Sequence, residues 1–401
     1  MKKAVVVVSA CRTPFGSFGG VLKDTSVYDL FAVVMRQLVA RAGIQPSEIQ
    51  EIFWGVGDTA EAEDVVTPVV ARQAQLKAGI PASVVSQSID RACCSSTAAI
   101  GNAVRLIRSD EIDVAIAGGV QILSRTPFVL RSARWGKSLG HRSLEDPLFA
   151  LGYKNFAAVA LDAGNVAVQS GITREMQDEY ALQSQRRYQS ALEGGRISAQ
   201  IAPVEIAVKG GKAFVDRDEF PRPTTTLELL SRLPTIYGSP TVTAGNAPGL
   251  NDGAAGLLLM SEEKAKRLSA PILGVLEDCV SVAAEPHLLA KAPAYAVREL
   301  LRRHAAVSLG GLAVLEINEA FAAVVLTTLR VLADGDAGLE AELLRKTNAN
   351  GGAIAVGHAN AASGARIVME CLYRLIERGG GRGVASLCGG LAQADAVLVR
   401  V

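Results

Sequence analysis

The chain has 401 residues, 49% of them hydrophobic and 20% charged, so it can bury a large core and is not expected to be disordered. A length of this order is typical of roughly two or three domains. The 41 Lys and Arg residues nearly balance the 40 Asp and Glu residues, and the resulting net charge of +1 gives no reason to expect binding to nucleic acid or to an anionic membrane.

Cysteine usage argues against a metal site and against disulfides. The cysteines form no C-x-x-C pair and the chain has only four histidines, so no zinc site is expected. Their irregular spacing favours reduced thiols in a cytoplasmic protein. The apolar run near the N-terminus is too short for a signal peptide, because Arg12 and Pro14 follow at once. No stretch approaches the ~20 apolar residues of a membrane helix.

Strands and helices are predicted to alternate along the first 120 residues. Apolar patterning places strands at 4–9, 49–55, 84–89 and 114–117, and helices at 26–42, 67–78 and 95–108. Gly43 ends the first helix, and Pro68 lies in the first turn of the second. This alternation predicts a mostly parallel α/β sheet.

The middle of the chain differs from its flanks. Residues 120–243 are richer in Arg, Pro and charge, and contain one clear helix at 174–193. We interpret them as an inserted loop domain carried on the first half. Loops that a rigid scaffold holds in place often contact substrates.

The α/β pattern returns after residue 254. Strands are predicted at 256–260, 272–282, 314–317, 384–387 and 396–401, and helices at 290–304, 319–333 and 362–378. Each half ends with a small-residue helix followed by a strand that closes on Gly-Gly. We therefore expect two duplicated halves, residues 1–119 plus 244–270 and residues 271–401, with a site where they meet.

The first segment that could carry catalytic residues is SIDRACCSSTAAIGNA, residues 88–103. Cys93 and Cys94 stand just before a helix, whose free N–H groups and positive end lower a thiol's pKa and favour the nucleophilic thiolate. The alternative is that both are small core residues.

Two further segments place polar residues where strands give way to helices. In LEINEAFAAVV (315–325), Asn318 and Glu319 open a helix, or simply cap it. In NANGGAIAVGHANAASGAR (348–366), His358 lies among glycines and small residues. It could polarise a nucleophile or donate to an oxyanion, or be a hydrogen-bonded core histidine.

The fourth segment, ASLCGGLAQADA (385–396), ends a buried strand with Cys388 and follows it with two glycines, which expose N–H groups to a ligand. Cys388 could also be a buried structural cysteine. In order and spacing, the four segments resemble the thiolase family over nearly the whole chain. VSACRTPFGSFGG near the N-terminus and VTAGNAPGLNDGAA at 242–255 also resemble thiolase motifs.

The resemblance implies a thiolase fold, in which two duplicated βαβαβαββ halves form five α-β-α-β-α layers with an inserted loop domain. It implies an acyl-CoA C-acyltransferase that cleaves a 3-oxoacyl-CoA with CoA or runs the reverse Claisen condensation. Coenzyme A would be a co-substrate, with no metal and no tightly bound cofactor. Relatives form homodimers or homotetramers, and a requirement for a small partner subunit stays open.

The resemblance also assigns roles to single residues. Cys93 matches the nucleophile that carries the acyl group, and His358 the base that takes its proton. Cys388 matches the cysteine that moves a proton to or from the α-carbon. Asn318 matches the residue that holds an oxyanion-binding water, in a first oxyanion hole shared with His358. The N–H groups of Cys93 and Gly390 would form a second hole, and CoA would contact Ala247, Pro248, Gly249 and Phe321.

Several positions depart from the family pattern. Asp90 replaces an asparagine, CCSSTA places Ser96 and Thr97 where glycine and leucine are usual, and Pro248 replaces a serine. Further departures are GGVQ at 118–121, VALDAG at 159–164, Ala359-Asn360-Ala361 after the histidine and GLA at 390–392. They predict an acyl group other than acetoacetyl: branched, aromatic or carboxylated. Arginines 125, 131, 134 and 142 could meet a carboxylate or the CoA phosphates, or form a solvated loop.

The sequence also bears on three rival interpretations. A ketoacyl synthase would have histidine in place of Asn318, and a hydroxymethylglutaryl-CoA synthase would lack Cys388 and use a glutamate. A thiolase-like subunit that binds acyl-CoA without activity, or that needs a partner chain, is the alternative of a different class.

Overall fold

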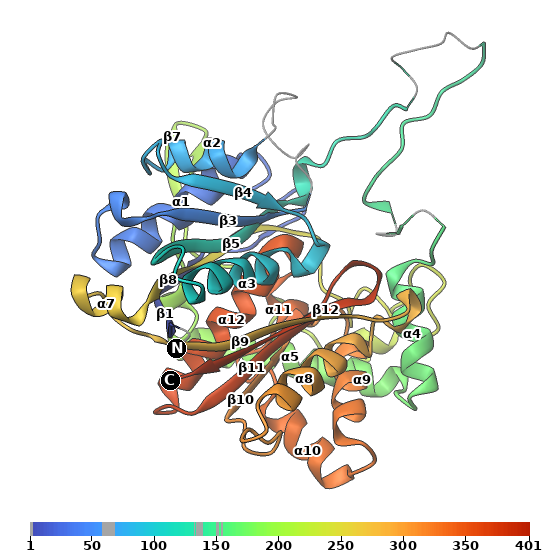
Figure 1. The fold of residues 1–401 in the computed structure, drawn as a ribbon. Coiled ribbons are helices and arrows are strands. Elements are labelled where there is room, and N and C mark those ends of the chain that lie inside the picture. Colours follow the sequence, from blue (N-terminus) through green and yellow to red (C-terminus); the bar gives the residue numbers. More distant parts are fainter. Residues whose placement is uncertain (1–2, 58–68, 132, 134–138, 150–151, 154) are drawn as a thin grey trace.

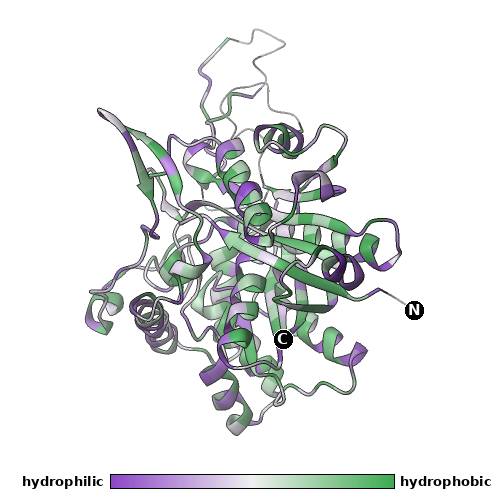
Figure 2. Ribbon diagram, turned by 90° about the vertical axis from the view of Figure 1, so that its left-hand side faces the viewer, coloured by the Kyte–Doolittle hydropathy of each residue, from purple (hydrophilic) through white to green (hydrophobic). Residues whose placement is uncertain are grey.

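The computed structural model of this chain describes residues 3–57, 69–131, 133, 139–149, 152–153 and 155–401. These residues form five layers, in which three layers of helices alternate with two layers of strands (Figure 1). Hydrophobic residues concentrate on the central strands, and hydrophilic residues lie mainly on the outer helices and loops (Figure 2). Both faces of the central strands are therefore covered, which explains why the strands at 5–12, 114–122 and 251–261 are buried along their whole length.

The first half has a strand layer between outer and inner helices. Its strands are β1 (Val5–Arg12), β2 (Gly16–Ser17), β3 (Glu51–Val56), β4 (Val85–Ile89), β5 (Val114–Ile122) and β8 (Asn251–Ser261). Its helices are α1 (Val27–Ala42), α2 (Val70–Lys77), α3 (Ser95–Arg108) and α7 (Glu262–Leu268). Ser26 caps α1 by accepting a hydrogen bond from the Asp29 N–H, and Gly43 ends it with a φ of 66°, as predicted.

The second half repeats this plan. Its strands are β9 (Gly274–Ala283), β10 (Val314–Ile317), β11 (Arg382–Cys388) and β12 (Gln393–Arg400). Its helices are α8 (Ala292–Arg303), α9 (Ala322–Ala333), α10 (Ala337–Lys346), the short α11 (Ala353–Val356) and α12 (Asn360–Glu377).

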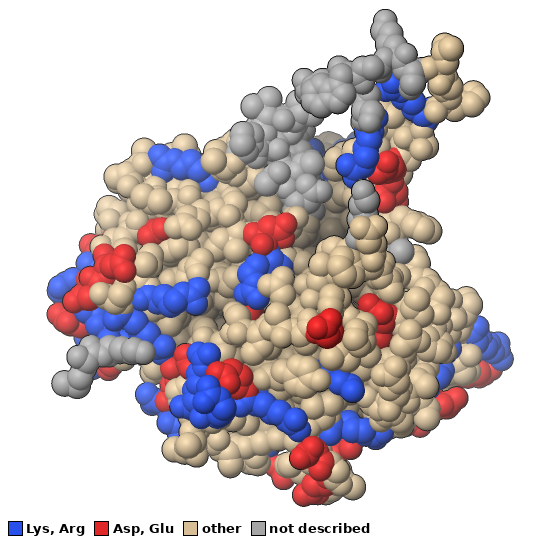
Figure 3. Space-filling view, turned by 45° about the vertical axis from the view of Figure 1, so that its right-hand side comes forward, with Lys and Arg blue, Asp and Glu red and all other residues tan. Residues whose placement is uncertain are grey.

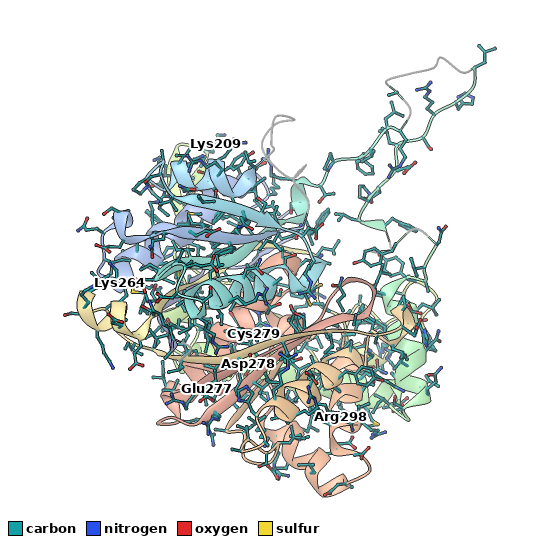
Figure 4. All side chains as sticks on the ribbon, in the orientation of Figure 1. Lys209, Lys264, Glu277, Asp278, Cys279 and Arg298 are labelled. Atoms are coloured by element: carbon teal, nitrogen blue, oxygen red, sulfur yellow. The ribbon has the colours of Figure 1, made fainter. Side chains whose placement is uncertain are left out.

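Helices α3 and α12 form the inner layer between the two halves (Figure 1). Small residues let them approach closely: a side chain added at Gly364 would place its Cβ 2.8 Å from Ser96 Oγ. Helix α12 packs on β5 of one half and on β11 of the other. Arg108 of α3 donates to the carbonyl oxygens of Leu276 and Glu277 on β9, the strand that also carries Asp278 and Cys279 (Figure 4).

The predicted mostly parallel sheet is wrong in its strand orientations. Ten of the described strands form one mixed sheet in the order β10-β11-β12-β9-β1-β8-β5-β3-β4, with β2 paired to β8. The pairs β3–β4, β3–β5 and β10–β11 are parallel, whereas the other pairs in this sheet are antiparallel. Strands β1 and β9 join the halves through two residue pairs, Val6 with Val275 and Val7 with Gly274.

The segment predicted as an insertion contains more regular structure than expected. Strand β5 continues to Ile122, and the segment holds α4 (Val159–Gln169), α5 (Arg174–Glu193), the hairpin β6 (Val204–Val208) and β7 (Gly211–Val215), and α6 (Leu227–Ser231). The described residues between 126 and 149 extend away from the two halves (Figure 1). The domain limits at residues 119, 244 and 270 stay a prediction.

The surface carries no large area of a single charge sign on the face shown in Figure 3, where Lys and Arg are interspersed with Asp and Glu. None of the helices in the described ranges combines the length and the apolar character needed to cross a bilayer. All six cysteines are free thiols.

Candidate active site

A cavity of about 320 Å³ lies where strands β4, β5, β10 and β11 end. Residues of both halves and of the middle segment line it, including Cys93, His358, Cys388 and Gly390. The segments that the sequence singled out separately therefore meet at one place. Among the described residues, the cavity included, no three His, Cys, Asp or Glu side chains are grouped so that they could hold a metal ion.

A tight turn positions Cys93 at the cavity. After β4, the Asp90 carboxylate accepts a hydrogen bond from the Ala92 N–H at 2.9 Å, and Ser95 Oγ accepts one from the Arg91 N–H at 2.8 Å. Ala92 adopts a φ of 49°, a left-handed conformation that costs a non-glycine residue on the order of 1 kcal/mol. The turn directs Cys93 toward the second half, one residue before Cys94, which is fully buried.

His358 stands on a second strained turn. Gly357 has a φ of 102°, and a Cβ there would lie 2.3 Å from the Asn251 side chain. The His358 N–H donates to Asn251 Oδ1 at 3.1 Å, which ties this turn to β8. His358 Nε2 lies 3.1 Å from Cys93 Sγ, and its Nδ1 lies 2.7 Å from Ser363 Oγ on α12. When Nδ1–H donates to Ser363, Nε2 is free to accept the thiol proton.

The expected resting thiolate is not what the surroundings of Cys93 favour. Helix α3 begins at Ser95, so Cys93 lies in the preceding 3-10 turn rather than at the helix end itself. Burial raises the pKa of Cys93 to about 12, and burial together with the positive charge of Arg366 lowers the pKa of His358 to about 3. The free site is therefore a neutral thiol–imidazole pair across the physiological pH range.

These pKa shifts predict how Cys93 reacts with iodoacetamide in the free protein. Only the thiolate reacts, and the raised pKa of the Cys93 thiol keeps the thiolate a small fraction up to pH 9. The alkylation rate should therefore keep rising about tenfold per pH unit from pH 6 to 9. A thiol with a depressed pKa would instead reach a plateau near neutrality. Mass spectrometry of the modified peptide measures the rate, and a plateau below pH 8 would contradict the neutral pair.

Cys388 ends β11 and is followed by Gly389, in a turn that has no room for a larger residue. A Cβ at Gly389 would lie 2.7 Å from Cys94 Sγ, so the nucleophile turn and the Cys388 turn are in contact. Burial and the neighbouring Cys93 raise the pKa of Cys388, which keeps it a thiol able to give a proton.

Tyr153 is a member of the cavity wall that the sequence did not reveal. A Cβ at Gly390 would lie 2.3 Å from Tyr153 Oη, so the phenol hydroxyl occupies the space above this glycine. Burial and the nearby Cys93 raise the pKa of Tyr153 to about 12, and its hydroxyl therefore stays protonated. Nothing in the local pattern around residue 153 signals this placement, because it depends on the path of the middle segment.

Asn318 is not among the described residues that line the cavity. Its side chain is fully buried, and neither its Oδ1 nor its Nδ2 has a hydrogen-bond partner among the described residues. Its backbone N–H donates to the Ser386 carbonyl oxygen at 2.9 Å, which fixes it beside β11. A buried unpaired amide is costly, and a water that reaches it from the cavity would satisfy it.

The interpretation of Glu319 as a first-turn helix residue is wrong. Helix α9 begins at Ala322, with Phe321 as its N-cap, and Glu319 is fully buried. Its carboxylate accepts hydrogen bonds from Tyr180 Oη and Ser184 Oγ of α5, both at 2.8 Å, and from the Ile354 N–H at 2.9 Å. Glu319 therefore connects the middle segment to the loop that carries His358.

Only some of the residues assigned to CoA, and none of the described arginines assigned to an acyl carboxylate, line the cavity. Pro248, Gly249 and Phe321 line the cavity, whereas Ala247 is buried outside its wall. Arginines 125, 131 and 142 are not among the described wall residues, and Arg134 lies outside the described residues. Arg131 forms an exposed ion pair with Glu145 at 2.7 Å.

Two family models cover nearly the whole chain: "Thiolase, N-terminal domain" matches residues 5–263 and "Thiolase, C-terminal domain" matches residues 270–401. The chain is 38% identical over 401 residues to a probable acetyl-CoA acetyltransferase of Escherichia coli (strain K12), with 99% of both chains covered. It is 39% identical over 409 residues to a beta-ketoadipyl-CoA thiolase of Pseudomonas aeruginosa, which covers 100% of this chain and 99% of the relative.

The crystal structure of human mitochondrial 3-ketoacyl-CoA thiolase superposes with a TM-score of 0.93 at 35% identity, with 99% of both chains covered. The predicted fold class and family are thereby confirmed. The alternative of a binding subunit without activity is not favoured, because these relatives are named as enzymes. The chain belongs to the thiolase family, the acyltransferases that act on acyl-CoA thioesters, as its motifs predicted.

Proposed function

We propose that this chain cleaves a 3-oxoacyl-CoA with CoA, or runs the reverse Claisen condensation, through an acyl group carried on Cys93. The observation that carries the proposal is the 3.1 Å contact between Cys93 Sγ and His358 Nε2, in a cavity that Cys388 also lines. A thiol next to a base performs nucleophilic catalysis, and a second thiol in the same cavity supplies an acid.

In the cleavage direction, Cys93 Sγ attacks the 3-keto carbon while its proton passes to His358 Nε2. The bond between the α-carbon and that carbonyl carbon then breaks, which leaves an acyl thioester on Cys93 and the enolate of a shorter acyl-CoA. The Cys388 thiol protonates the α-carbon of the enolate. The resulting Cys388 thiolate takes the proton of a new CoA thiol, whose sulfur attacks the acyl group. His358 finally returns its proton to the Cys93 thiolate, and all groups regain their starting state.

Two groups of donors would stabilise the negative oxygens along this path. His358 and a water bound to Asn318 form the first oxyanion hole, and the unpaired amide of Asn318 supports this assignment. The N–H groups of Cys93 and Gly390 form the second hole. One donor of this kind is worth roughly 3–4 kcal/mol of transition-state stabilisation. Tyr153, whose hydroxyl lies above Gly390, is positioned to add a donor there.

We infer that coenzyme A is the co-substrate and that it reaches Cys93 past Pro248, Gly249 and Phe321, which line the cavity, with Ala247 behind them. We also infer an acyl group other than simple acetoacetyl. Its support is that Val159 and Asn360, two departures from the family pattern, line the cavity together with Tyr153. The described wall contains no Lys or Arg, which favours a branched or aromatic group over a carboxylated one.

We propose that the protein forms a homodimer or a homotetramer, and that it acts in the cytoplasm. β4 is the terminal strand of the sheet, and Val85 on it is 58% exposed. An exposed sheet edge offers unpaired backbone groups to a second copy. Scattering measurements of the purified protein report its mass, and the same sample shows whether activity needs a partner chain.

Trapping the acyl-enzyme tests the proposed function. The protein is mixed with an acyl-CoA, digested at low pH and fragmented in a mass spectrometer. We expect the acyl mass on Cys93 and release of free CoA thiol. A series of 3-oxoacyl-CoAs should rank a branched or aromatic substrate above acetoacetyl-CoA. The absence of both acyl transfer and thiolysis with every thioester in the series would leave only a binding role.

A further inference from the structure

Asp395 has a buried carboxylate that accepts hydrogen bonds from residues on both sides of Cys93. It does not line the reaction cavity. It lies on β12 and is 2% exposed. Arg91 Nη1 donates to its two oxygens at 3.1 and 3.2 Å, and Thr97 Oγ1 donates to its Oδ2 at 2.5 Å. Arg91 precedes Cys93 by two residues and Thr97 follows it by four, so the three side chains bracket the nucleophile.

The same carboxylate is fixed relative to Cys388 by strand register. Strands β11 and β12 are antiparallel, with Leu387 opposite Asp395 and Cys388 opposite Ala394. Asp395 therefore stands one residue away from the cross-strand partner of Cys388. Hydrogen bonds that one carboxylate accepts thus connect the Cys93 turn of the first half to the strand paired with Cys388 in the second.

Further contacts hold Arg91 in this arrangement. Its Nε donates to Gln393 Oε1 at 3.1 Å, and its Nη1 is 3.3 Å from Ser281 Oγ on β9. A second cavity of about 160 Å³ lies beside Arg91, Thr97 and Asp395, separate from the reaction cavity in its lining residues. Arg91, Thr97 and Asp395 are therefore not part of the described wall of the reaction cavity.

We propose that Arg91, Thr97 and Asp395 are positioning residues that set the spacing between the Cys93 and Cys388 thiols. The inference rests on the proposed function, in which the two thiols act in turn on neighbouring carbons. Burying a carboxylate costs free energy unless donors compensate it. Here the donors are Arg91, just before the nucleophile turn, and Thr97, in the first turn of α3. Thr97, which stands where the family pattern has leucine, supplies the hydroxyl that completes the set.

The experiment compares kcat for thiolysis in Thr97→Val and Asp395→Asn with the unaltered protein. Valine keeps the shape of threonine and removes only the hydroxyl. Because misplacement by about 1 Å can cost about 100-fold in rate, we expect kcat to fall 10- to 100-fold in both variants. The KM for CoA should change less than twofold, because the cavity wall is untouched. Thr97→Ser, which keeps the hydroxyl, should recover kcat to within about threefold of the original.

Asp278→Asn is the matched control. Asp278 lies on the neighbouring strand β9 (Figure 4) and also pairs with partners from other elements, Arg108 at 3.6 Å and His304 at 3.1 Å. It has no connection to the Cys93 turn among the described contacts, so its variant should keep the original kcat. Thermal melting of each variant identifies any general loss of folding.

A second measurement separates spacing from damage to Cys93 itself. Alkylation of Cys93 by iodoacetamide should stay within about twofold in Thr97→Val, because the burial that raises the Cys93 pKa and sets its thiolate fraction is unchanged. The original kcat in both variants, or a loss of alkylation in parallel with kcat, would overturn the inference. An unaltered protein with no thiolysis and no acyl group on Cys93 would instead refute the proposed function.

Discussion

Replacement of Cys93 by serine is expected to lower kcat for thiolysis by about 10⁴-fold or more. A hydroxyl is a far weaker nucleophile than a thiol, and it has to lose its proton to the same base. Burial has already lowered the pKa of His358 to about 3, so this imidazole is a weak base that a hydroxyl cannot use efficiently. Spectrophotometric assay of 3-oxoacyl-CoA cleavage measures the loss.

Cys94→Ser is the matched control for this prediction. Cys94 is adjacent in sequence and fully buried, but its Sγ faces the Leu387 carbonyl oxygen at 3.9 Å and is not part of the cavity wall. We expect this variant to keep kcat within about tenfold of the original. Should Cys94→Ser abolish turnover while Cys93→Ser retains it, the assignment of the nucleophile within the pair would be reversed.

Glu319→Ala is expected to have the largest effect on stability. The substitution removes one carboxylate and leaves Tyr180 Oη, Ser184 Oγ and the Ile354 N–H without their buried acceptor. An unsatisfied buried group costs about 1–3 kcal/mol, so the free energy of unfolding should fall by at least about 3 kcal/mol. Chemical denaturation, followed by circular dichroism, measures this change.

Two further variants define the cause. Glu263→Ala removes an exposed glutamate from α7 and should leave the free energy of unfolding within about 0.5 kcal/mol of the original. Glu319→Gln keeps the volume but replaces one acceptor by a donor facing donors, and we expect an intermediate loss. Equal stability of Glu319→Ala and Glu263→Ala would show that these hydrogen bonds do not hold the His358 loop.

The local sequence pattern predicts helices and strands correctly where apolar periodicity is strong and turn residues flank the segment. The limits of α3 at residues 95–108, of α5 at 174–193 and of β10 at 314–317 agree with the structure, because apolar periodicity and flanking turn residues mark both ends. Strand orientation was predicted less well. Alternating elements indicate parallel neighbours, but β8 and β12 enter the sheet from the opposite end and pair antiparallel.

The site was predictable in part for a similar reason. Cys93, His358, Cys388 and Gly390 belong to short motifs, and the structure brings all four to one cavity. Contacts between residues far apart in the chain could not be predicted, because neither local segment contains a pattern that identifies its partner. The hydrogen bond between Glu319 and Tyr180 spans 139 positions, and that between Thr97 and Asp395 spans 298. The placement of Tyr153 also depends on distant packing.

Strand β12 lies in the interior of the sheet, and this has a consequence for biosynthesis. β12 ends at Arg400 and pairs with β11 on one side and β9 on the other. A growing polypeptide on the ribosome therefore cannot close its second half until β12 has been translated and has left the exit tunnel. Until then neither Asp395 nor the closed turn after Cys388 is in place, so the enzyme should be inactive until β12 has joined the sheet.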